Sequence, residues 1–219
     1  MKKLYLYAVV ISILLFRCAP SRYVVPLNEK EHAVTATFGG PMIGFSGAVI
    51  PVPLTSVGYG YGLDSSTTLY GNLHTTSLLY GTIQTDIGVC WSIYQKKKFG
   101  ISGNLGAQLM FDKWERNFRA WPTVDFNAYR FFRPSGSFYY FGIDNWIELS
   151  KQRAHNQEQQ VHLLMNPHVG IQWKKQFWSY QLESKWILPY VKNEPNVVDY
   201  KGIAGSGALG VYFGVYRKF

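Results

Sequence analysis

Apolar and polar residues alternate along most of the chain after residue 30. The clearest stretch, 81–93, places Ile83 and Ile87 on one side and Gln84 and Asp86 on the other. Because successive side chains of a strand point to opposite faces, a period of two predicts strands with one apolar and one polar wall. No long amphipathic helix is predicted after residue 30. The predicted strands are 33–39, 53–62, 67–76, 81–93, 99–111, 120–131, 138–149, 161–173, 177–188 and 205–218.

The lengths of these strands and of their connections favour a membrane-spanning barrel. The fourth to ninth predicted strands have roughly 11–13 residues, close to the length that crosses a bilayer at a tilt. The short predicted connections are 64–66, 95–98, 133–137 and 174–176. The long predicted connections are 40–52, 112–119, 150–160 and 189–204. The connection 77–80 is an exception, because it is short where a long loop is expected. Short periplasmic turns that alternate with long outer loops are typical of transmembrane β-barrels. The sequence therefore predicts an all-β fold, an antiparallel up-and-down transmembrane β-barrel of about ten strands, within a range of eight to twelve.

The last strand carries a family resemblance. Residues 208–219 alternate between apolar and small or semi-polar side chains and end on the aromatic Phe219. This segment resembles the C-terminal strand of the outer-membrane β-barrel proteins of Gram-negative bacteria, with Arg217 in place of an apolar residue. The resemblance implies a location in the bacterial outer membrane. It also implies two partners, the outer-membrane lipids and the barrel-assembly machinery, which would recognise the chain through Phe219.

The N-terminus has the composition of a secretion signal. Lys2 and Lys3 precede an apolar run, 4–16, that is too short to cross a bilayer, and Cys18 follows. This arrangement resembles a bacterial lipoprotein signal, with Arg17 where a small residue is usual. The resemblance implies a signal peptide over 1–17 and an acylated Cys18. A periplasmic tether is then expected over 18–30, and the barrel domain over 31–219. The alternative is an ordinary cleaved signal peptide.

Charge and cysteine content exclude several classes of function. Removal of residues 1–17, with Lys2, Lys3, Arg17 and no acid, lowers the formal net charge from +9 to +6. This charge is modest and dispersed, so no nucleic-acid partner is expected. The second cysteine, Cys90, cannot form a disulfide framework with Cys18, and no metal site or cofactor is predicted.

The polar walls define the candidate site residues. If the apolar walls face lipid, ionisable side chains collect in a narrow lumen, where they must form ion pairs or hydrogen bonds. The predicted polar network of the lumen consists of Asp86, Asp125, Asp144, Glu148, Glu183, Lys185, His162 and His168. We interpret this network as a structural core and assign no catalytic residues. Small inward residues such as Gly58, Gly60 and Gly62 predict either a cavity beside the closure of the barrel or a space that large side chains of the opposite wall fill.

Function is less constrained than fold. The interpretation that fits best is an integral outer-membrane barrel with a structural or surface-interaction role and a largely plugged lumen. One alternative is a lipid-anchored soluble β-barrel that binds a hydrophobic ligand inside. A second is an outer-membrane acyl hydrolase that modifies lipid, for which His74 and Ser77 are the candidates on the chain. The apolar connection 40–52 is expected to fold over the barrel mouth or to dip into the outer leaflet. The sequence names no small-molecule ligand.

Overall fold

The computed structural model describes residues 23–114, 116–152, 158–193 and 198–219. The strands form one antiparallel sheet in which neighbours in sequence are mostly neighbours in space. In chain order the elements are β1 (His32–Phe45), β2 (Ala48–Pro51), β3 (Leu54–Gly62), β4 (Thr67–His74), α2 (Thr75–Leu79), β5 (Thr82–Gln95), β6 (Phe99–Asp112), β7 (Asn117–Phe131), β8 (Phe138–Ile147), β9 (Leu163–Lys175), β10 (Trp178–Lys192) and β11 (Ser206–Lys218).

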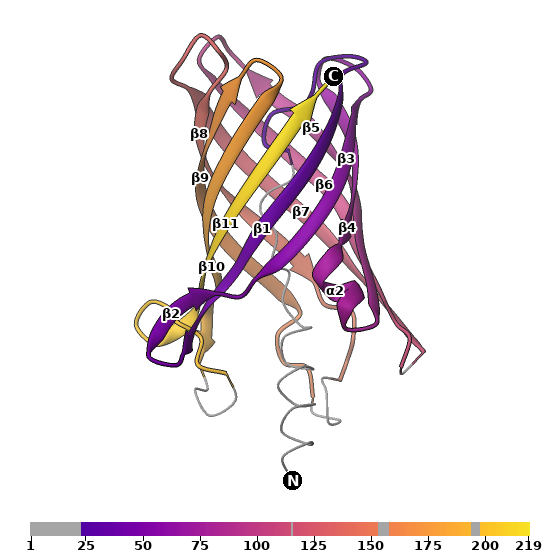
Figure 1. Ribbon diagram of the computed structural model, residues 1–219, viewed down its shortest axis with the longest axis vertical. Helices are drawn as coiled ribbons and strands as arrows, with labels where there is room; N and C mark the ends of the chain where they lie inside the picture. The colour runs from indigo at the N-terminus through magenta and orange to yellow at the C-terminus, as the bar shows by residue number, and fades with distance from the viewer. Residues whose placement is uncertain (1–22, 115, 153–157, 194–197) are drawn as a thin grey trace.

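The sheet closes into a barrel through its first and last long strands. β1 pairs with β11 from Ala33 opposite Lys218 to Pro41 opposite Gly210. β1 and β3 to β11 thus form a ten-stranded barrel, and β2 is an extra strand that pairs with the far end of β1. Figure 1 shows the C-terminus and the start of β1 at the end of the barrel with the short turns, and α2 at the opposite end. The predicted antiparallel barrel of about ten strands is confirmed.

The two walls of the barrel have opposite polarity, as the alternation predicted. On β5, Gln84 and Asp86 are buried in the lumen, whereas Ile83 and Ile87 are 52% and 53% exposed on the outside. Because the polar residues are inside and the apolar residues outside, the interior does not suit a large hydrophobic ligand. This finding rules out the alternative of a soluble barrel with an apolar core.

Two connections differ from their predicted form. The connection 40–52 contains a β-hairpin, since β1 continues to Phe45 and pairs with β2 around Ser46 and Gly47. Both turn residues have positive φ, 50° and 84°, which suits a tight hairpin. In Figure 1 the hairpin extends outward past the barrel wall, so the expectation that it covers the mouth is wrong.

The other connection, 77–80, lies in and after α2, a helix of one turn. In the described part of the chain, no helix is long and apolar enough to cross a membrane.

Candidate functional site

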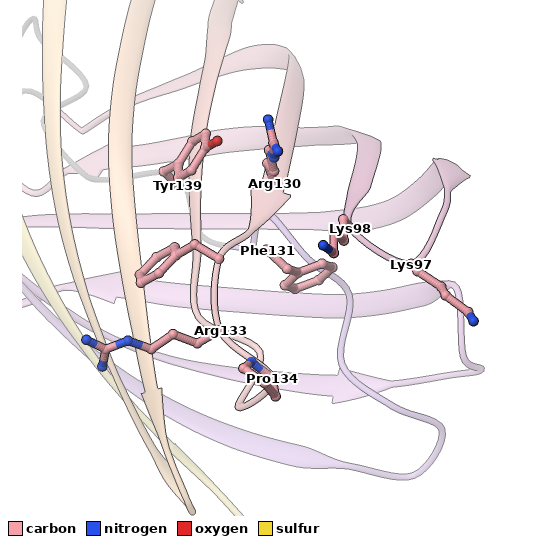
Figure 2. Close-up of a pocket in the computed structure, with 8 residues that line it drawn as sticks. Lys97, Lys98, Arg130, Phe131, Arg133, Pro134 and Tyr139 are labelled. Atoms are coloured by element: carbon pink, nitrogen blue, oxygen red, sulfur yellow. The ribbon is translucent and has the colours of Figure 1, made fainter.

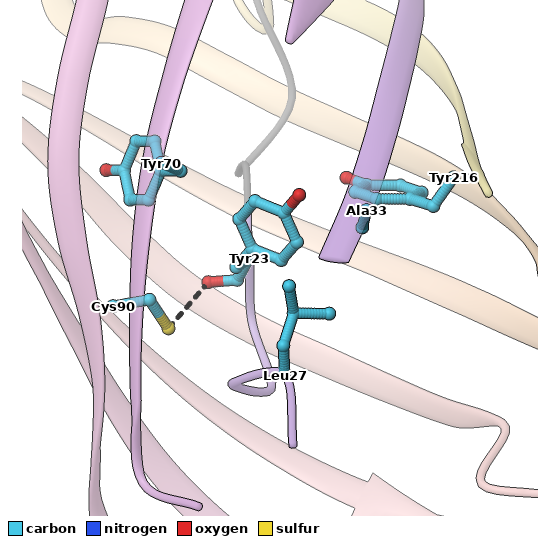
Figure 3. Close-up of a cluster of buried hydrophobic side chains, with 6 residues drawn as sticks. All are labelled: Tyr23, Leu27, Ala33, Tyr70, Cys90 and Tyr216. Carbon is cyan, nitrogen blue, oxygen red and sulfur yellow. Dashed lines mark hydrogen bonds between the residues drawn. The ribbon is translucent and has the colours of Figure 1, made fainter. Parts of the chain in front are cut away.

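Residues 23–31 form what we call the N-terminal segment, and its first part, 23–27, lies inside the barrel (Figure 3). Tyr23, Val24 and Leu27 are buried, with at most 5% of their surfaces exposed. The lumen wall supplies hydrogen bonds to the backbone of this segment. The donors to the Tyr23 carbonyl are Cys90 Sγ at 3.1 Å and Asn104 Nδ2 at 3.2 Å. A buried backbone needs such partners, so the wall and the segment are matched to each other.

Two further hydrogen bonds join the barrel wall to the N-terminal segment. Ser102 Oγ donates to the Val24 carbonyl at 2.5 Å, and the Leu27 N–H donates to Thr68 Oγ1 at 2.7 Å. Because these bonds come from β4 and β6, they hold the segment against one side of the lumen.

Glycines of β3 make room for the segment. A Cβ at Gly60 would lie 2.3 Å from Tyr23 Oη, and one at Gly62 would lie 1.9 Å from the Asn28 carbonyl oxygen. The Tyr23 ring also packs against Tyr216, with ring centroids 5.8 Å apart. The space predicted beside the barrel closure is therefore filled. The occupant is the N-terminal segment, whereas the sequence predicted either a cavity or side chains from the opposite wall.

The segment is fixed where it leaves the lumen. The Lys30 N–H donates to the Gly62 carbonyl at 2.8 Å, and Glu31 Oε2 accepts from Lys218 Nζ at 3.1 Å and from the Asn28 N–H at 3.0 Å. Burial alone would raise the pKa of Glu31, but the Asn28 hydrogen bond and the charge of Lys218 hold this pKa below its ordinary value.

The expected tether 18–30 is thus packed in the lumen over 23–27, whereas 28–30 are exposed. Cys18 and the expected signal peptide 1–17 lie outside the described residues. The sequence did contain a signal for the lumen position of 23–27. The run Tyr23-Val24-Val25-Pro26-Leu27 is more apolar than a solvated tether requires.

A charge cluster occupies the lumen between β8 and β10. Lys185 Nζ lies 2.8 Å from Asp144 Oδ2 and 3.4 Å from Glu183 Oε1, and all three side chains are at most 3% exposed. Tyr140 Oη donates to Glu183 Oε2 at 2.6 Å. The Lys185 ammonium also lies over the Tyr212 ring, 5.8 Å from its centroid. Desolvated charges are stable here because each has an opposite charge or a donor within reach.

A second cluster joins β4 and β5. Asp86 accepts a hydrogen bond from Asn72 Nδ2 at 2.6 Å, and its Oδ2 lies 2.9 Å from His74 Nε2. Ser77 Oγ donates to Gln84 Oε1 at 2.7 Å. His74 is buried inside the lumen, next to Asp86 on the neighbouring strand and away from lipid. This position does not favour a lipid-modifying acyl hydrolase that works on the outer wall.

The remaining predicted residues divide between the lumen and its mouth. Asp125 is buried opposite Asp144 in the β7–β8 register, and His168 Nε2 lies 2.7 Å from Asn127 Oδ1. By contrast, Glu148 and His162 lie beyond the ends of β8 and β9.

At the mouth, His162 is exposed, and its Nδ1 lies 2.9 Å from the Glu148 carbonyl oxygen. Glu148 Oε2 accepts a hydrogen bond from Trp121 Nε1 at 2.6 Å. The predicted strands 138–149 and 161–173 were each two residues too long at this end of the barrel. For this reason Glu148 and His162 were assigned to the lumen. Asn72 and the N-terminal segment were absent from the predicted network.

The outward wall decides the environment of the barrel. Leu105, Phe141 and Val169, on three different strands, are each more than half exposed, and similar residues continue around the barrel. A continuous apolar band of this kind is far larger than the patches that soluble proteins leave in water. Closed antiparallel barrels with this band and an even number of strands are of the outer-membrane type. The protein is an integral outer-membrane β-barrel.

Comparisons with known proteins concern only the fold of this outer-membrane barrel. No protein-family model and no curated protein matches the chain. An outer membrane channel from Pseudomonas putida F1 is similar with a TM-score of 0.48 and 10% identity, over 93% of this chain and 100% of that one. The translocator domain of the autotransporter NalP from Neisseria meningitidis has a TM-score of 0.47 and 8% identity, over 100% and 95%. The NanC porin has a TM-score of 0.45 and 8% identity, over 86% and 100%.

The lumen of the outer-membrane barrel contains paired charges and hydrogen-bonded polar side chains. Within the described ranges, no group of three or more His, Cys, Asp or Glu side chains could hold a metal ion. Cys90 is buried and donates its thiol hydrogen to Tyr23. The polar side chains described above bind one another and the backbone of the N-terminal segment.

Proposed function

We propose that this outer-membrane barrel is closed to solutes and has a structural or surface-interaction role. The observation that carries the proposal is the N-terminal segment packed in the lumen, with its backbone bonded to Cys90, Asn104, Ser102 and Thr68. A segment held by several buried hydrogen bonds and by aromatic packing is a standing part of the core rather than a passing obstruction.

The far half of the lumen supports the same proposal. Trp121 and Trp146 are each 4% exposed near the outer ends of β7 and β8, with ring centroids 6.1 Å apart. Nearer the N-terminal segment, Tyr129 and Tyr140 cluster with Val24, and both are among the largest fully buried side chains of the described residues. A barrel of ten strands is narrow, so these rings and the N-terminal segment leave little cross-section for a water-filled path.

The outer hairpin of β1 and β2 is the surface that we assign to the interaction role. Phe45 and Val49 are 63% and 54% exposed on it. Its edge is braced by the β10–β11 connection, because the Lys201 N–H donates to the Met42 carbonyl and the Gly44 N–H to the Asp199 carbonyl, each at 2.9 Å. A stiff strand pair that carries apolar side chains suits contact with another surface better than a mobile loop does.

Conductance in planar bilayers tests the closed lumen. The full chain is compared with a variant that lacks residues 23–30, after both show the heat-dependent gel mobility of a folded barrel. We expect no steady conductance from the full chain and discrete steps from the deletion. Steady conductance from the full chain would overturn the proposal and favour a transport role. A folded deletion variant that remains silent would assign the closure to the wall side chains instead of the segment.

Two partner interactions are part of the proposal. The Phe219 backbone exchanges hydrogen bonds of 3.0 Å with His32, and the two rings stack 5.8 Å apart. We infer that the assembly machinery binds Phe219 before β1 and β11 pair, so removal of Phe219 should slow insertion into the membrane.

Acylation of Cys18 is tested by labelling with a radioactive fatty acid. The substitution Cys18→Ser should abolish this labelling.

A further inference from the structure

A groove of about 600 Å³ lies at the short-turn end of the barrel, between the β5–β6 and β7–β8 turns (Figure 2). It is lined by Lys97, Lys98, Arg130, Phe131, Phe132, Arg133, Pro134 and Tyr139. Arg130 and Tyr139 are register partners that alternate with the inward Tyr129 and Tyr140, so this pair faces away from the lumen. The groove therefore includes the outer wall at this end, and Phe131 forms its inner side by packing against the inward Tyr129 and Phe138. The groove lies apart from the polar network of the lumen.

The groove is positively charged and lacks acidic residues. Four of its eight lining residues are lysine or arginine, and none is aspartate or glutamate. In the part of the chain that the structure describes, none of these four cations lies within 4.0 Å of a carboxylate, whereas Lys185, Lys201 and Lys218 all do. Like charges gathered without a counter-charge favour an anionic ligand.

Aromatic packing and a backbone bond shape the groove. Phe132 and Tyr139 stack with ring centroids 6.2 Å apart and an interplanar angle of 16°. The Arg133 guanidinium lies 5.7 Å from the centroid of the Phe132 ring. The Phe131 N–H donates to the Lys98 carbonyl at 2.9 Å, which ties the two turns together. The cations are therefore presented by a braced frame, and a guanidinium held in place binds phosphate oxygens in a fixed geometry.

The groove borders the apolar band. Phe141, two residues beyond Tyr139 on the same outward face of β8, is 65% exposed and belongs to the band. A ligand in the groove could thus place charge against the cations and hydrocarbon against Tyr139 and Phe141. A soluble anion would use only the first of these contacts.

We propose that this groove binds an anionic glycerophospholipid of the periplasmic leaflet. Its phosphate lies among Lys98, Arg130 and Arg133, and its acyl chains follow Tyr139 and Phe141 down the outer wall. Cations near a membrane surface attract anionic headgroups, and the groove adds a defined place for one of them. The site is independent of whether the lumen conducts.

Native mass spectrometry of the purified full chain tests the site. The protein in detergent is offered phosphatidylglycerol and phosphatidylcholine with identical acyl chains at equal concentrations. Arg130→Gln/Arg133→Gln is compared with a control of equal charge change, Lys175→Gln/Arg217→Gln. Both control residues are exposed at the same end of the barrel and do not line the groove. Heat-dependent gel mobility shows that each variant is folded.

We expect phosphatidylglycerol to be retained in preference to phosphatidylcholine. The groove variant should weaken this retention roughly thirtyfold, the factor that two cations in contact with the headgroup contribute together, whereas the control removes two charges that do not line the groove. The control should weaken it by less than about threefold. Equal retention of the two lipids, or equal losses in the two variants, would overturn the proposal. Full displacement of phosphatidylglycerol by millimolar inorganic phosphate would also overturn it, because a soluble anion would then be the ligand.

Discussion

Replacement of Lys185 by methionine tests whether the buried charge cluster is a structural core. Lys185 Nζ lies 2.8 Å from Asp144 and 3.4 Å from Glu183, and each of the three side chains is at most 3% exposed. Methionine keeps most of the volume of lysine but removes the positive charge. Two desolvated carboxylates then remain close together without the cation that offsets them.

The expected loss follows from the cost of leaving buried charge uncompensated. Removal of one partner of a buried ion pair typically costs about 3–5 kcal/mol. We expect Lys185→Met to lose about that much free energy of unfolding, and Asp144→Asn/Glu183→Gln/Lys185→Met to recover most of it. Lys175→Met, at an exposed position, should change stability by less than about 0.5 kcal/mol.

Urea unfolding of the barrel in detergent micelles, followed by tryptophan fluorescence, measures these differences. With a slope of about 3 kcal/mol per molar urea, the Lys185→Met midpoint should fall by roughly 1 M or more. A loss below about 1 kcal/mol would show that the lumen is wet enough to solvate the two carboxylates, which would refute the reasoning. If the triple variant loses as much free energy of unfolding as Lys185→Met, the loss comes from packing and not from uncompensated charge.

Three further predictions concern the N-terminal segment and the hairpin. Gly60→Val should displace the Tyr23 ring, because even a Cβ at this position lies 2.3 Å from Tyr23 Oη. Channel recordings should then show openings that the control Gly71→Val lacks, since a Cβ at Gly71 meets only ordinary contacts of 3.7 Å. Glu31→Gln should destabilise the barrel by at most about 1 kcal/mol in urea unfolding. Since the pKa of Glu31 is lowered from 4.5, the stability difference between the two proteins should be present above pH 4.5 and disappear as the pH falls through the lowered value. A stability difference that persists at low pH would contradict the assigned charge. Phe45→Ser should leave folding and gel mobility unchanged, since the side chain is 63% exposed, but should reduce surface interactions measured by cell adhesion; normal adhesion would exclude the hairpin as the contact.

The sequence by itself determined the barrel and the polarity of its walls. The alternation of Ile83, Gln84, Thr85 and Asp86 is local information, because each strand residue faces opposite to its neighbours whatever the rest of the chain does. Short turns and long loops also follow from local spacing, so the strand count and order were predictable. Strand ends were less so, which is why Glu148 and His162 were placed in the lumen.

Only the tertiary structure decided what fills the barrel and which charges meet. Lys185 and Asp144 are 41 residues apart, and their contact depends on the stagger of three strands, which alternation does not specify. The N-terminal segment reaches Cys90 across 67 residues, and nothing local to Tyr23 states that the glycines of β3 leave space for its ring. Alternation is a property of neighbouring residues, whereas the filling of a closed lumen depends on volumes and hydrogen-bond partners that distant strands bring together.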